Sequence, residues 1–556
     1  MRKFRLLFAS TLLAASFLSC TAIKKTALEI EPMDTSVQVS ERKTVLTQSQ
    51  LKKWSHADLQ EDGIPGISLE KAYDFLAGKK GEKVIVGVID SGIDIEHEDL
   101  RDVLWINTGE IKSNNKDDDN NGYVDDVYGW NFLGGNGEEA PEQYEVTRLY
   151  SEYKNRFESE KKEVLTGEDK AERENYKQYE QAYKDASSTH NATLSRLEFL
   201  KSCFEGIETA LNKSDFTKQE LDTIKFKNPM LNNQVSSIKS FFDLGYDRES
   251  FNKFYKEHEK TKHFDLDFNG RAIVGDDPSI IQYKKYGNSL VMGSKSGESH
   301  GSHVAGIILA KRNNGVGIQG IANNAKLMSL RAVPDGDERD KDVALAIRYA
   351  VDNGAKVINM SFGKPWSPNK EWVLDAIKYA EKHDVLLVHA AGNSNENIDI
   401  EQNWPNDSKD MSKEVSSNFI SVGAIGFDVN EDLLAPFSNY GKKNVDIFAP
   451  GVQIYSSVPN NNYDSFSGTS MASPHVAGVA ALIRSYYPQF SAKEVKGIIL
   501  ASGSELDMQV LVPGHISMKK RMSSLSASGK LLNAYNAVFL ANKLAIKLSN
   551  SAVSSK

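Results

Sequence analysis

The chain has 556 residues, of which 40% are hydrophobic and 26% charged, so it has enough apolar residues for a large core and is not an intrinsically disordered chain. Its 76 acidic residues outnumber its 67 lysines and arginines, and the resulting net charge of -9 argues against a nucleic-acid-binding protein. The only two cysteines, Cys20 and Cys203, exclude a disulfide scaffold and a cysteine-built zinc site.

The first twenty residues predict an export signal. A basic start (MRKFR) precedes an apolar run that ends at Leu18 and is shorter than a membrane-spanning helix requires. Ser19 and Cys20 close the run and resemble the bacterial lipoprotein box, in which the cysteine is lipidated and becomes the mature N-terminus. Ordinary signal-peptide cleavage is the alternative. We therefore expect a signal peptide at 1–20, lipidation at Cys20, and a protein that is exported to the periplasm or cell surface and anchored to a membrane by lipid.

The following elements predict an α/β fold. Residues 21–60 are polar without a clear period, which predicts a tether. The run Val84 to Asp90 (VIVGVID) is continuously apolar and β-branched, as in a strand buried on both faces of a parallel sheet. Further along, strands are predicted at 326–333, 356–362 and 385–391, and helices at 343–353, 372–383, 469–487 and 492–501. Because strands and helices alternate, we expect a layered structure around a parallel sheet.

A charged segment interrupts this pattern at 138–265. It is rich in Lys, Glu, Tyr and Gln, and runs such as AERENYKQYEQAYKDA place opposite charges four residues apart, as on an exposed helix. The pattern favours a solvated helical arm without chemistry of its own. A lid or a partner-docking element is the alternative.

Three residues in separate motifs carry the chemistry. Asp90 ends a buried strand, so its carboxylate emerges at the carboxyl edge of the sheet, where α/β proteins place their sites. His300 opens HGSHVAG at the start of a predicted helix. Ser470 lies in GTSMASPHVAG at the start of another helix, whose N-terminus offers free N–H groups and positive potential to a developing oxyanion.

These three residue types are those that acyl transfer to a serine requires. A serine hydroxyl is a poor nucleophile until a base removes its proton, and an imidazole does this near pH 7 when a carboxylate orients it and stabilises its charged form. The chain order Asp, His, Ser is that of subtilisin. The sequence resembles the subtilisin-like serine proteases (subtilases) in VIDSGIDIEHEDL, HGSHVAG and GTSMASPH, and also in VINMSFG, AAGN and FSNYG.

The resemblance implies a serine endopeptidase that forms an acyl-enzyme on Ser470 with polypeptide substrates. It implies a three-layer fold with a mainly parallel central sheet over 61–545, with 138–265 inserted as a helical arm. Asn393 matches the amide of the oxyanion hole, and substrate pairs as an added strand with Ser361, Phe362 and Gly363. Three other histidines match non-catalytic positions: His97, His303 and His475.

An acidic loop predicts a structural calcium ion. The run DDDNNGYVDD alternates oxygen-bearing side chains around a glycine, which suits Ca²⁺. A solvated acidic turn is the alternative. The expected ligands are Asp117, Asp119, Asn121, Asp125 and Asp126.

The long separation of the first two catalytic motifs departs from the family. Asp90 and His300 lie 300 − 90 = 210 residues apart, where the family has a few tens, so the insertion must loop out on one side of the fold. A catalytically silent subtilase fold that binds a partner through the insertion is one alternative, and an esterase or peptide ligase using the same site is another. The intact set of Asp90, His300, Asn393 and Ser470 argues against the silent fold.

Overall fold

The computed structural model describes residues 28–39, 42, 44–137, 140–159, 167–243, 247–281, 286–295 and 299–554. The predicted signal peptide and Cys20 lie outside these residues. None of the helices in the described ranges has both the length and the apolar character needed to cross a membrane.

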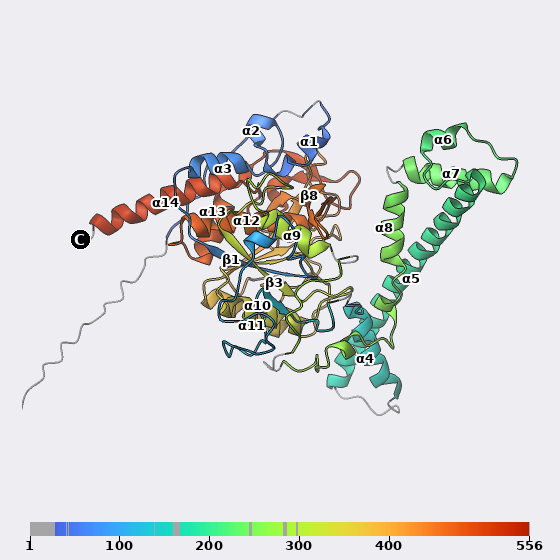
Figure 1. The fold of residues 1–556 in the computed structure, drawn as a ribbon, viewed down its shortest axis with the longest axis horizontal. Coiled ribbons are helices and arrows are strands. Elements are labelled where there is room, and N and C mark those ends of the chain that lie inside the picture. Colours follow the sequence, from blue (N-terminus) through green and yellow to red (C-terminus); the bar gives the residue numbers. More distant parts are fainter. Residues whose placement is uncertain are drawn as a thin grey trace, which may run out of the picture.

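Within the described residues, a nine-stranded sheet forms the centre of the body (Figure 1). The strand order is β10-β13-β7-β6-β5-β4-β1-β3-β2, and every neighbouring pair is parallel except β10 with β13. This arrangement confirms the mainly parallel α/β fold. The strands are β1 (Val84–Asp90), β2 (Gly129–Asn131), β3 (Ala325–Arg331), β4 (Val357–Met360), β5 (Leu386–Ala390), β6 (Phe419–Ile425), β7 (Ile447–Pro450), β10 (Ser504–Glu505) and β13 (Lys530–Leu531). Two separate hairpins are β8 (Ile454–Val458) with β9 (Asn462–Phe466), and β11 (Gln509–Leu511) with β12 (Lys519–Arg521).

Helices cover both faces of the sheet (Figure 1). One face carries α9 (His300–Leu309), α12 (Thr469–Tyr486) and α13 (Ala492–Ser502), with α3 (Leu69–Leu76) and α14 (Ala534–Ser554) packed beside them. The other face carries α10 (Asp340–Asp352) and α11 (Lys370–Lys382). Shorter 3-10 turns are Trp54–His56, Arg101–Val103, Lys262–Phe264, Gly270–Ile273 and Met522–Ser524.

The first strand shows why its sequence is apolar at nearly every position. Val86 and Val88 are buried in the core on the α9 and α12 side, whereas Ile89 is buried in the core on the α10 and α11 side. Successive side chains of a strand point to opposite faces, so a strand covered on both faces loses the polar alternation of a surface strand.

The N-terminal segment differs from the predicted tether from residue 28 onward. Ser36 forms a parallel bridge with Glu505, and Val37 donates to the carbonyl of Glu505 at 3.0 Å, so the segment extends the sheet beyond β10. Two short helices follow, α1 (Gln48–Leu51) and α2 (Leu59–Asp62). Trp54 is 1% exposed. The few apolar residues of this segment are too widely spaced to show a period, and they are buried by parts of the chain that are distant in sequence.

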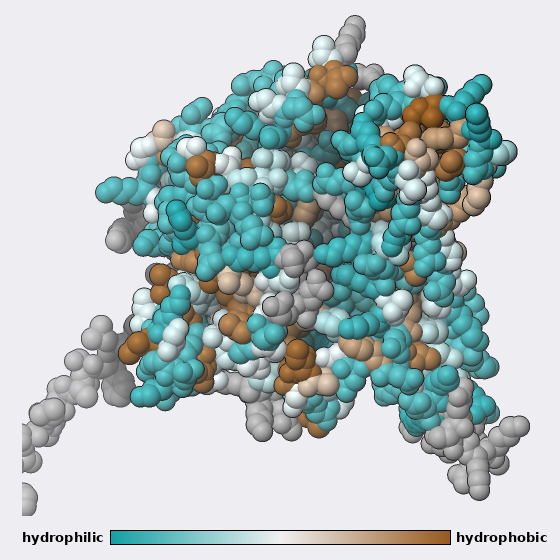
Figure 2. Space-filling model, turned by 45° about the vertical axis from the view of Figure 1, so that its right-hand side comes forward, coloured by the Kyte–Doolittle hydropathy of each residue, from teal (hydrophilic) through white to brown (hydrophobic). Residues whose placement is uncertain are grey.

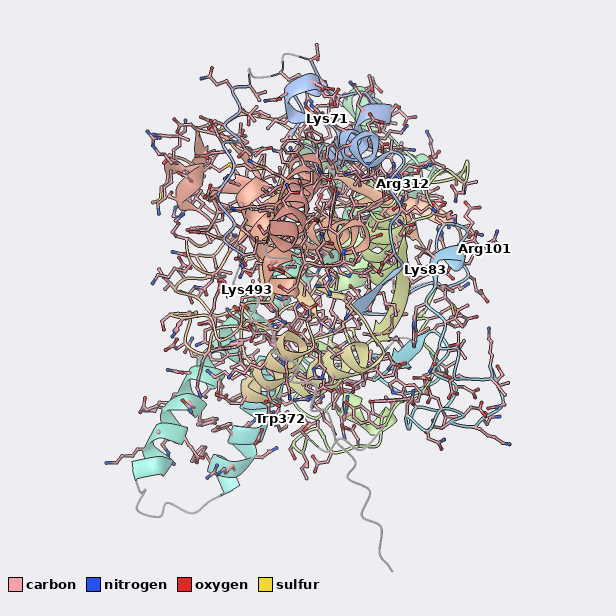
Figure 3. All side chains as sticks on the ribbon, turned by 90° about the vertical axis from the view of Figure 1, so that its left-hand side faces the viewer. Lys71, Lys83, Arg101, Arg312, Trp372 and Lys493 are labelled. Atoms are coloured by element: carbon pink, nitrogen blue, oxygen red, sulfur yellow. The ribbon has the colours of Figure 1, made fainter. Side chains whose placement is uncertain are left out.

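The insertion forms an arm that projects from the body (Figure 1). Its helices are α4 (Glu145–Ser159), α5 (Gly167–Leu211), α6 (Lys218–Thr223), α7 (Pro229–Asp243) and α8 (Arg248–His258). Seen from the side, α4 and the beginning of α5 extend beyond the body near α11, which carries the labelled Trp372 (Figure 3).

The far end of the arm has a hydrophobic core of its own. Phe204, Ile207, Ile238 and Phe251 are buried there together with Cys203. Charge pairs of the expected kind also occur, such as Lys184 with Glu180 at 2.7 Å. The arm is therefore more than a solvated helix, although the face of it seen in Figure 2 is mostly hydrophilic.

Candidate active site

Three strands deliver candidate site residues to one edge of the sheet. Asp90 is the last residue of β1, Ser361 follows β4, and Asn393 lies three residues beyond β5. Because β1, β4 and β5 are parallel neighbours, their carboxyl ends meet at the same edge.

Asp90 holds the ring of His300. Asp90 Oδ1 lies 2.8 Å from His300 Nδ1; the Asp90 side chain is 2% exposed, whereas that of His300 is 38% exposed. Burial lowers the pKa of His300, whereas the charge of Asp90 and its hydrogen bond raise it. The two effects of Asp90 together outweigh burial, so the pKa of His300 lies above its ordinary value. Gly301 permits this approach, since a Cβ atom there would lie 2.3 Å from the carbonyl oxygen of Gly92.

Ser470 lies in the first turn of α12 and is bound to the end of β4. Its hydroxyl donates to the carbonyl of Ser361 at 3.1 Å, and the Ser361 hydroxyl donates to the carbonyl of Ser470 at 2.9 Å. The Asn359 amide donates to the same Ser361 hydroxyl at 2.9 Å. The hydroxyl proton of Ser470 must turn away from the Ser361 carbonyl before a base can take it.

Asn393 presents its amide nitrogen beside the start of α12. Its Oδ1 accepts hydrogen bonds from Thr469 N at 2.8 Å and Thr469 Oγ1 at 2.9 Å. These two contacts fix the amide so that its NH₂ group is available to donate to a ligand. A Cβ atom on Gly468 would lie 3.5 Å from this nitrogen. An amide donor next to the N–H groups of a helix N-terminus can stabilise an oxyanion.

A pocket of about 360 Å³ opens beside Ser470. Phe362 and Gly363 line one part of it, together with Asn403. Phe362 is fixed through its carbonyl, which accepts from His389 Nε2 at 2.7 Å. The expected substrate-binding residues Ser361, Phe362 and Gly363 thus lie beside Ser470 or along this pocket.

The acidic loop brings only part of the expected calcium ligands together. Carboxylate oxygens of Glu110, Asp119 and Asp126 lie within 4.8 Å of one another, and this cluster could bind a metal ion. The Asn121 amide donates to Asp119 at 3.2 Å and to Asp126 at 3.0 Å. Oxygen-only donors suit a hard cation such as Ca²⁺. Glu110 lies before the acidic run, so the loop pattern did not reveal it.

The other two expected ligands have local partners. Asp125 accepts the main-chain N–H groups of Asn114 and Asn115 at 3.0 and 2.9 Å, so its carboxylate closes the preceding turn. Asp117 accepts from Gly122 N at 2.5 Å, while its second oxygen is buried without a hydrogen-bond partner. Asp117 and Asp125 are not members of the three-carboxylate cluster.

The remaining motif histidines serve packing. His303 Nε2 lies 2.9 Å from the carbonyl of Ile454, and His475 Nδ1 lies 2.8 Å from the carbonyl of Met471. Burial lowers the pKa of each of these two rings to about 3. His97 contacts the carbonyl of Asn462 at 3.1 Å.

Comparison with known proteins identifies the family. Residues 250–522 match the subtilase family. The chain is 37% identical to subtilisin DY of Bacillus licheniformis over 227 residues, which cover 40% of this chain and 77% of subtilisin DY. The chain belongs to the subtilase family. The matched residues begin within the arm and include His300, Asn393 and Ser470. Asp90 lies before them in the sequence.

Two further relatives align over a smaller share of their own length. A thermophilic serine proteinase of Bacillus sp. (strain AK1) is 44% identical over 188 residues, which cover 34% of this subtilase and 43% of the relative. A cell wall-associated protease of Bacillus subtilis (strain 168) is 38% identical over 214 residues, which cover 38% of this subtilase and 22% of the relative. This subtilase thus aligns with less than half of the length of either protein.

Proposed function

We propose that this subtilase is a serine endopeptidase. The observation that carries the proposal is the 2.8 Å contact between Asp90 and His300 at the sheet edge where Ser470 and Asn393 also lie. A carboxylate-bound imidazole with a raised pKa is a suitable base for a serine hydroxyl.

The side chains divide the reaction between them. Ser470 Oγ attacks the peptide carbonyl carbon, and His300 Nε2 takes the hydroxyl proton while Asp90 stabilises the imidazolium. The Asn393 amide and the Ser470 N–H donate to the oxyanion. When the C–N bond breaks, His300 returns the proton to the leaving amine, and water then hydrolyses the acyl-enzyme by the same proton path.

Substrate binding is proposed for the segment after β4. An extended peptide would pair with Ser361, Phe362 and Gly363 through main-chain hydrogen bonds, and the adjacent pocket would receive one side chain. The lining of this pocket by Asn393, Gln402 and Asn403 favours polar side chains.

Two measurements test the endopeptidase proposal. A fluorophosphonate probe should label wild-type protein but neither Ser470→Ala nor His300→Ala, and a peptide-library digest should show cleavage by wild type alone. A folded wild-type protein that is neither labelled nor cleaves any peptide would instead support a silent fold that acts as a binding scaffold. Faster turnover of esters with no amide cleavage would support the esterase alternative.

A structural calcium ion is proposed for the carboxylates of Glu110, Asp119 and Asp126. Bound Ca²⁺ would neutralise the repulsion among these carboxylates and stabilise the loop. Chelation should lower the melting temperature, and added Ca²⁺ should restore it in wild type but not in Asp119→Asn. Equal melting temperatures with and without chelator would contradict the proposal.

Export and lipid anchoring at Cys20 are proposed from the signal sequence. Radiolabelled fatty acid should be incorporated into wild type but not into Cys20→Ser, and the variant should leave the membrane fraction. Equal labelling of the two proteins would exclude Cys20 as the lipidated residue.

A further inference from the structure

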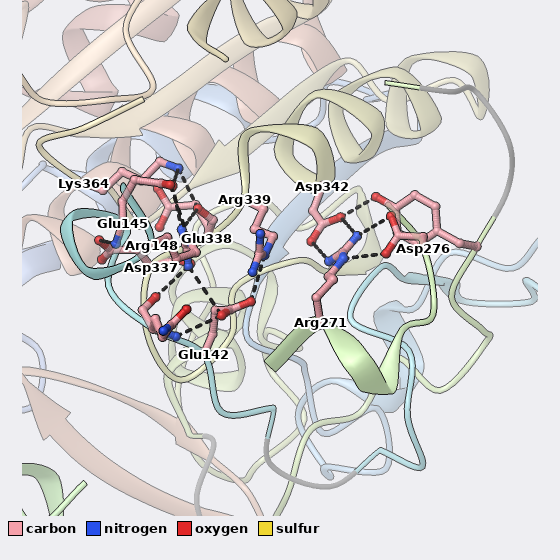
Figure 4. Close-up of polar contacts among 12 residues, drawn as sticks. Glu142, Glu145, Arg148, Arg271, Asp276, Asp337, Glu338, Arg339, Asp342 and Lys364 are labelled. Carbon is pink, nitrogen blue, oxygen red and sulfur yellow. Dashed lines mark hydrogen bonds and ion pairs between the residues drawn. The ribbon is translucent and has the colours of Figure 1, made fainter. Parts of the chain in front are cut away.

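The wall of the candidate substrate pocket is held from behind by the inserted arm. Lys364 lines the pocket that also contains Ser470, yet its side chain is 1% exposed. Its ammonium group lies 2.6 Å from Glu145 Oε2 and 2.9 Å from Asp340 Oδ1, and it donates to the carbonyl of Glu338 at 2.7 Å (Figure 4). Asp340 belongs to the body, whereas Glu145 is the first residue of α4 in the arm.

Glu145 is itself fixed at the root of the arm. Arg148 pairs with its carboxylate at 2.6 Å, and the Glu145 N–H donates to Asp337 Oδ2 at 2.7 Å. Burial raises the pKa of Glu145, but the charges of Arg148 and Lys364 lower it more, to about 2. The carboxylate is therefore ionised at any working pH, and the ion pair with Lys364 persists.

The arm also pairs with the segment between β3 and α10. Asp335 donates its N–H to the carbonyl of Ala140 at 2.8 Å, and Glu142 donates to the carbonyl of Asp335 at 2.8 Å. Gly336 allows the close approach, since a Cβ atom there would lie 2.3 Å from the carbonyl oxygen of Glu142. The entry to the arm thus joins a second part of the body through main-chain hydrogen bonds.

The exit from the arm is fastened nearby. Arg271 forms two hydrogen bonds to Asp342, at 2.6 and 2.8 Å, and two to Asp276, at 2.5 and 2.9 Å (Figure 4). Asp342 is completely buried in the first turn of α10. Bidentate contacts of this kind fix orientation as well as distance. Both ends of the arm are therefore anchored at the start of α10.

We propose that the root of the arm is part of the substrate cleft and that Glu145 is a positioning residue, which holds the pocket wall at 362–365 through Lys364. The inference rests on the proposed endopeptidase function for the role of the pocket. Neutralising Glu145 leaves the buried ammonium with one carboxylate and loosens the wall, while the residues that carry out the reaction keep their contacts. Substrate binding therefore weakens more than the chemical step.

The first test is Glu145→Gln in the full chain, assayed with a fluorogenic peptide amide. We expect KM to rise about tenfold and kcat to stay within about twofold of wild type. Glu208→Gln is the matched control, because Glu208 pairs with Arg248 at 3.0 Å at the far end of the arm; its kcat and KM should equal those of wild type. A KM change below about twofold in Glu145→Gln, or a fall in kcat alone, overturns the proposal.

A second variant tests the route through Lys364. Lys364→Gln should raise KM by a similar factor, and the double variant with Glu145→Gln should raise it no further, because both changes remove the same interaction. Multiplied KM effects in the double variant would show that Glu145 acts by another route. If Glu145→Gln does not fold, the KM of Lys364→Gln tests the proposal in its place. An unchanged KM of Lys364→Gln would then overturn the proposal.

A binding measurement separates this inference from the catalytic one. In a Ser470→Ala background, fluorescence anisotropy gives the Kd of the same peptide without turnover, and Glu145→Gln should raise this Kd about tenfold. An unchanged Kd overturns the positioning role even if wild type is an active peptidase. If wild type binds the peptide but cleaves nothing, the endopeptidase function is overturned. The positioning role of Glu145 is then still tested by the Kd of Glu145→Gln.

Discussion

The body and the arm are stabilised in different ways. In the body, strands such as β1 are covered by helices on both faces, and two large apolar cores contribute most of the stabilisation. In the arm, the 45-residue α5 is largely exposed, and a hydrophobic core of described residues lies at the far end around Phe204. Exposed pairs along α5, such as Glu180 with Lys184, contribute little to stability because water screens them.

This difference shows where each region has influence. The body creates the site locally, because strand ends and helix starts converge at one sheet edge. The arm reaches the site from its root, where a buried ion pair joins Glu145 to Lys364, and the chain just after the arm is held by the pair of Arg271 with Asp342. Substitutions in the body should thus alter catalysis, those at the far end should alter only the arm, and those at the root should alter both stability and binding.

The largest effect is expected in the body for Asn393→Ala. Loss of one preorganised oxyanion donor typically lowers kcat by about 10²–10³ with little change in KM. The matched measurement is steady-state kinetics on this variant and on Asn233→Ala, an exposed asparagine of α7 in the arm. A similar fall of kcat in both variants would contradict the view that the body, and not the far end of the arm, controls the reaction.

Phe204→Ala should destabilise the far end of the arm by about 3–5 kcal/mol, since Phe204 is fully buried in that core. Hydrogen exchange should accelerate in α5, α7 and α8, while amides of β1 and β4 keep their protection. Equal acceleration in the central strands would mean that arm and body unfold as one unit.

Glu338→Gln tests how the buried charges at the root of the arm make stability depend on pH. Burial raises the pKa of Glu338 to about 8, with Lys364 opposing and Asp337 adding to the shift. Between its ordinary pKa of 4.5 and about 8, the folded state keeps a proton that the unfolded state has released, so this group lowers stability as pH rises.

Urea unfolding at pH 5 and pH 8 measures that contribution. Wild type should lose more stability over this interval than Glu338→Gln, because glutamine cannot titrate. Glu180→Gln, on an exposed stretch of α5, should retain the wild-type pH dependence. Parallel behaviour of wild type and Glu338→Gln would show that Glu338 is ionised in the fold.

The smallest effect is expected for exposed pairs of the arm. Lys184→Ala should leave the free energy of unfolding close to the wild-type value, since the lysine side chain is 59% exposed. Kinetic constants should stay at wild-type values. A larger loss would indicate that charge pairs, and not only the apolar far end, hold the arm together.

The sequence by itself predicted the parallel α/β architecture and the three residues of the candidate triad. Asp90, His300 and Ser470 could be recognised because each stands at the end or beginning of an element whose pattern is local, and parallel strand ends meet at one edge. The predicted strand at 356–362 extended two residues too far, because Ser361 already bonds to Ser470 and Phe362 lines the pocket.

Only the tertiary structure decided which charged residues act together. Glu145 and Lys364 are 219 residues apart, and nothing in either local pattern names the other. Glu110 joins the acidic cluster from outside its motif, and apolar residues of 28–39 and 44–60 pack on the body although they show no apolar period. In each case the energy comes from contacts with distant segments, so the pairing depends on the burial and proximity that the completed fold creates.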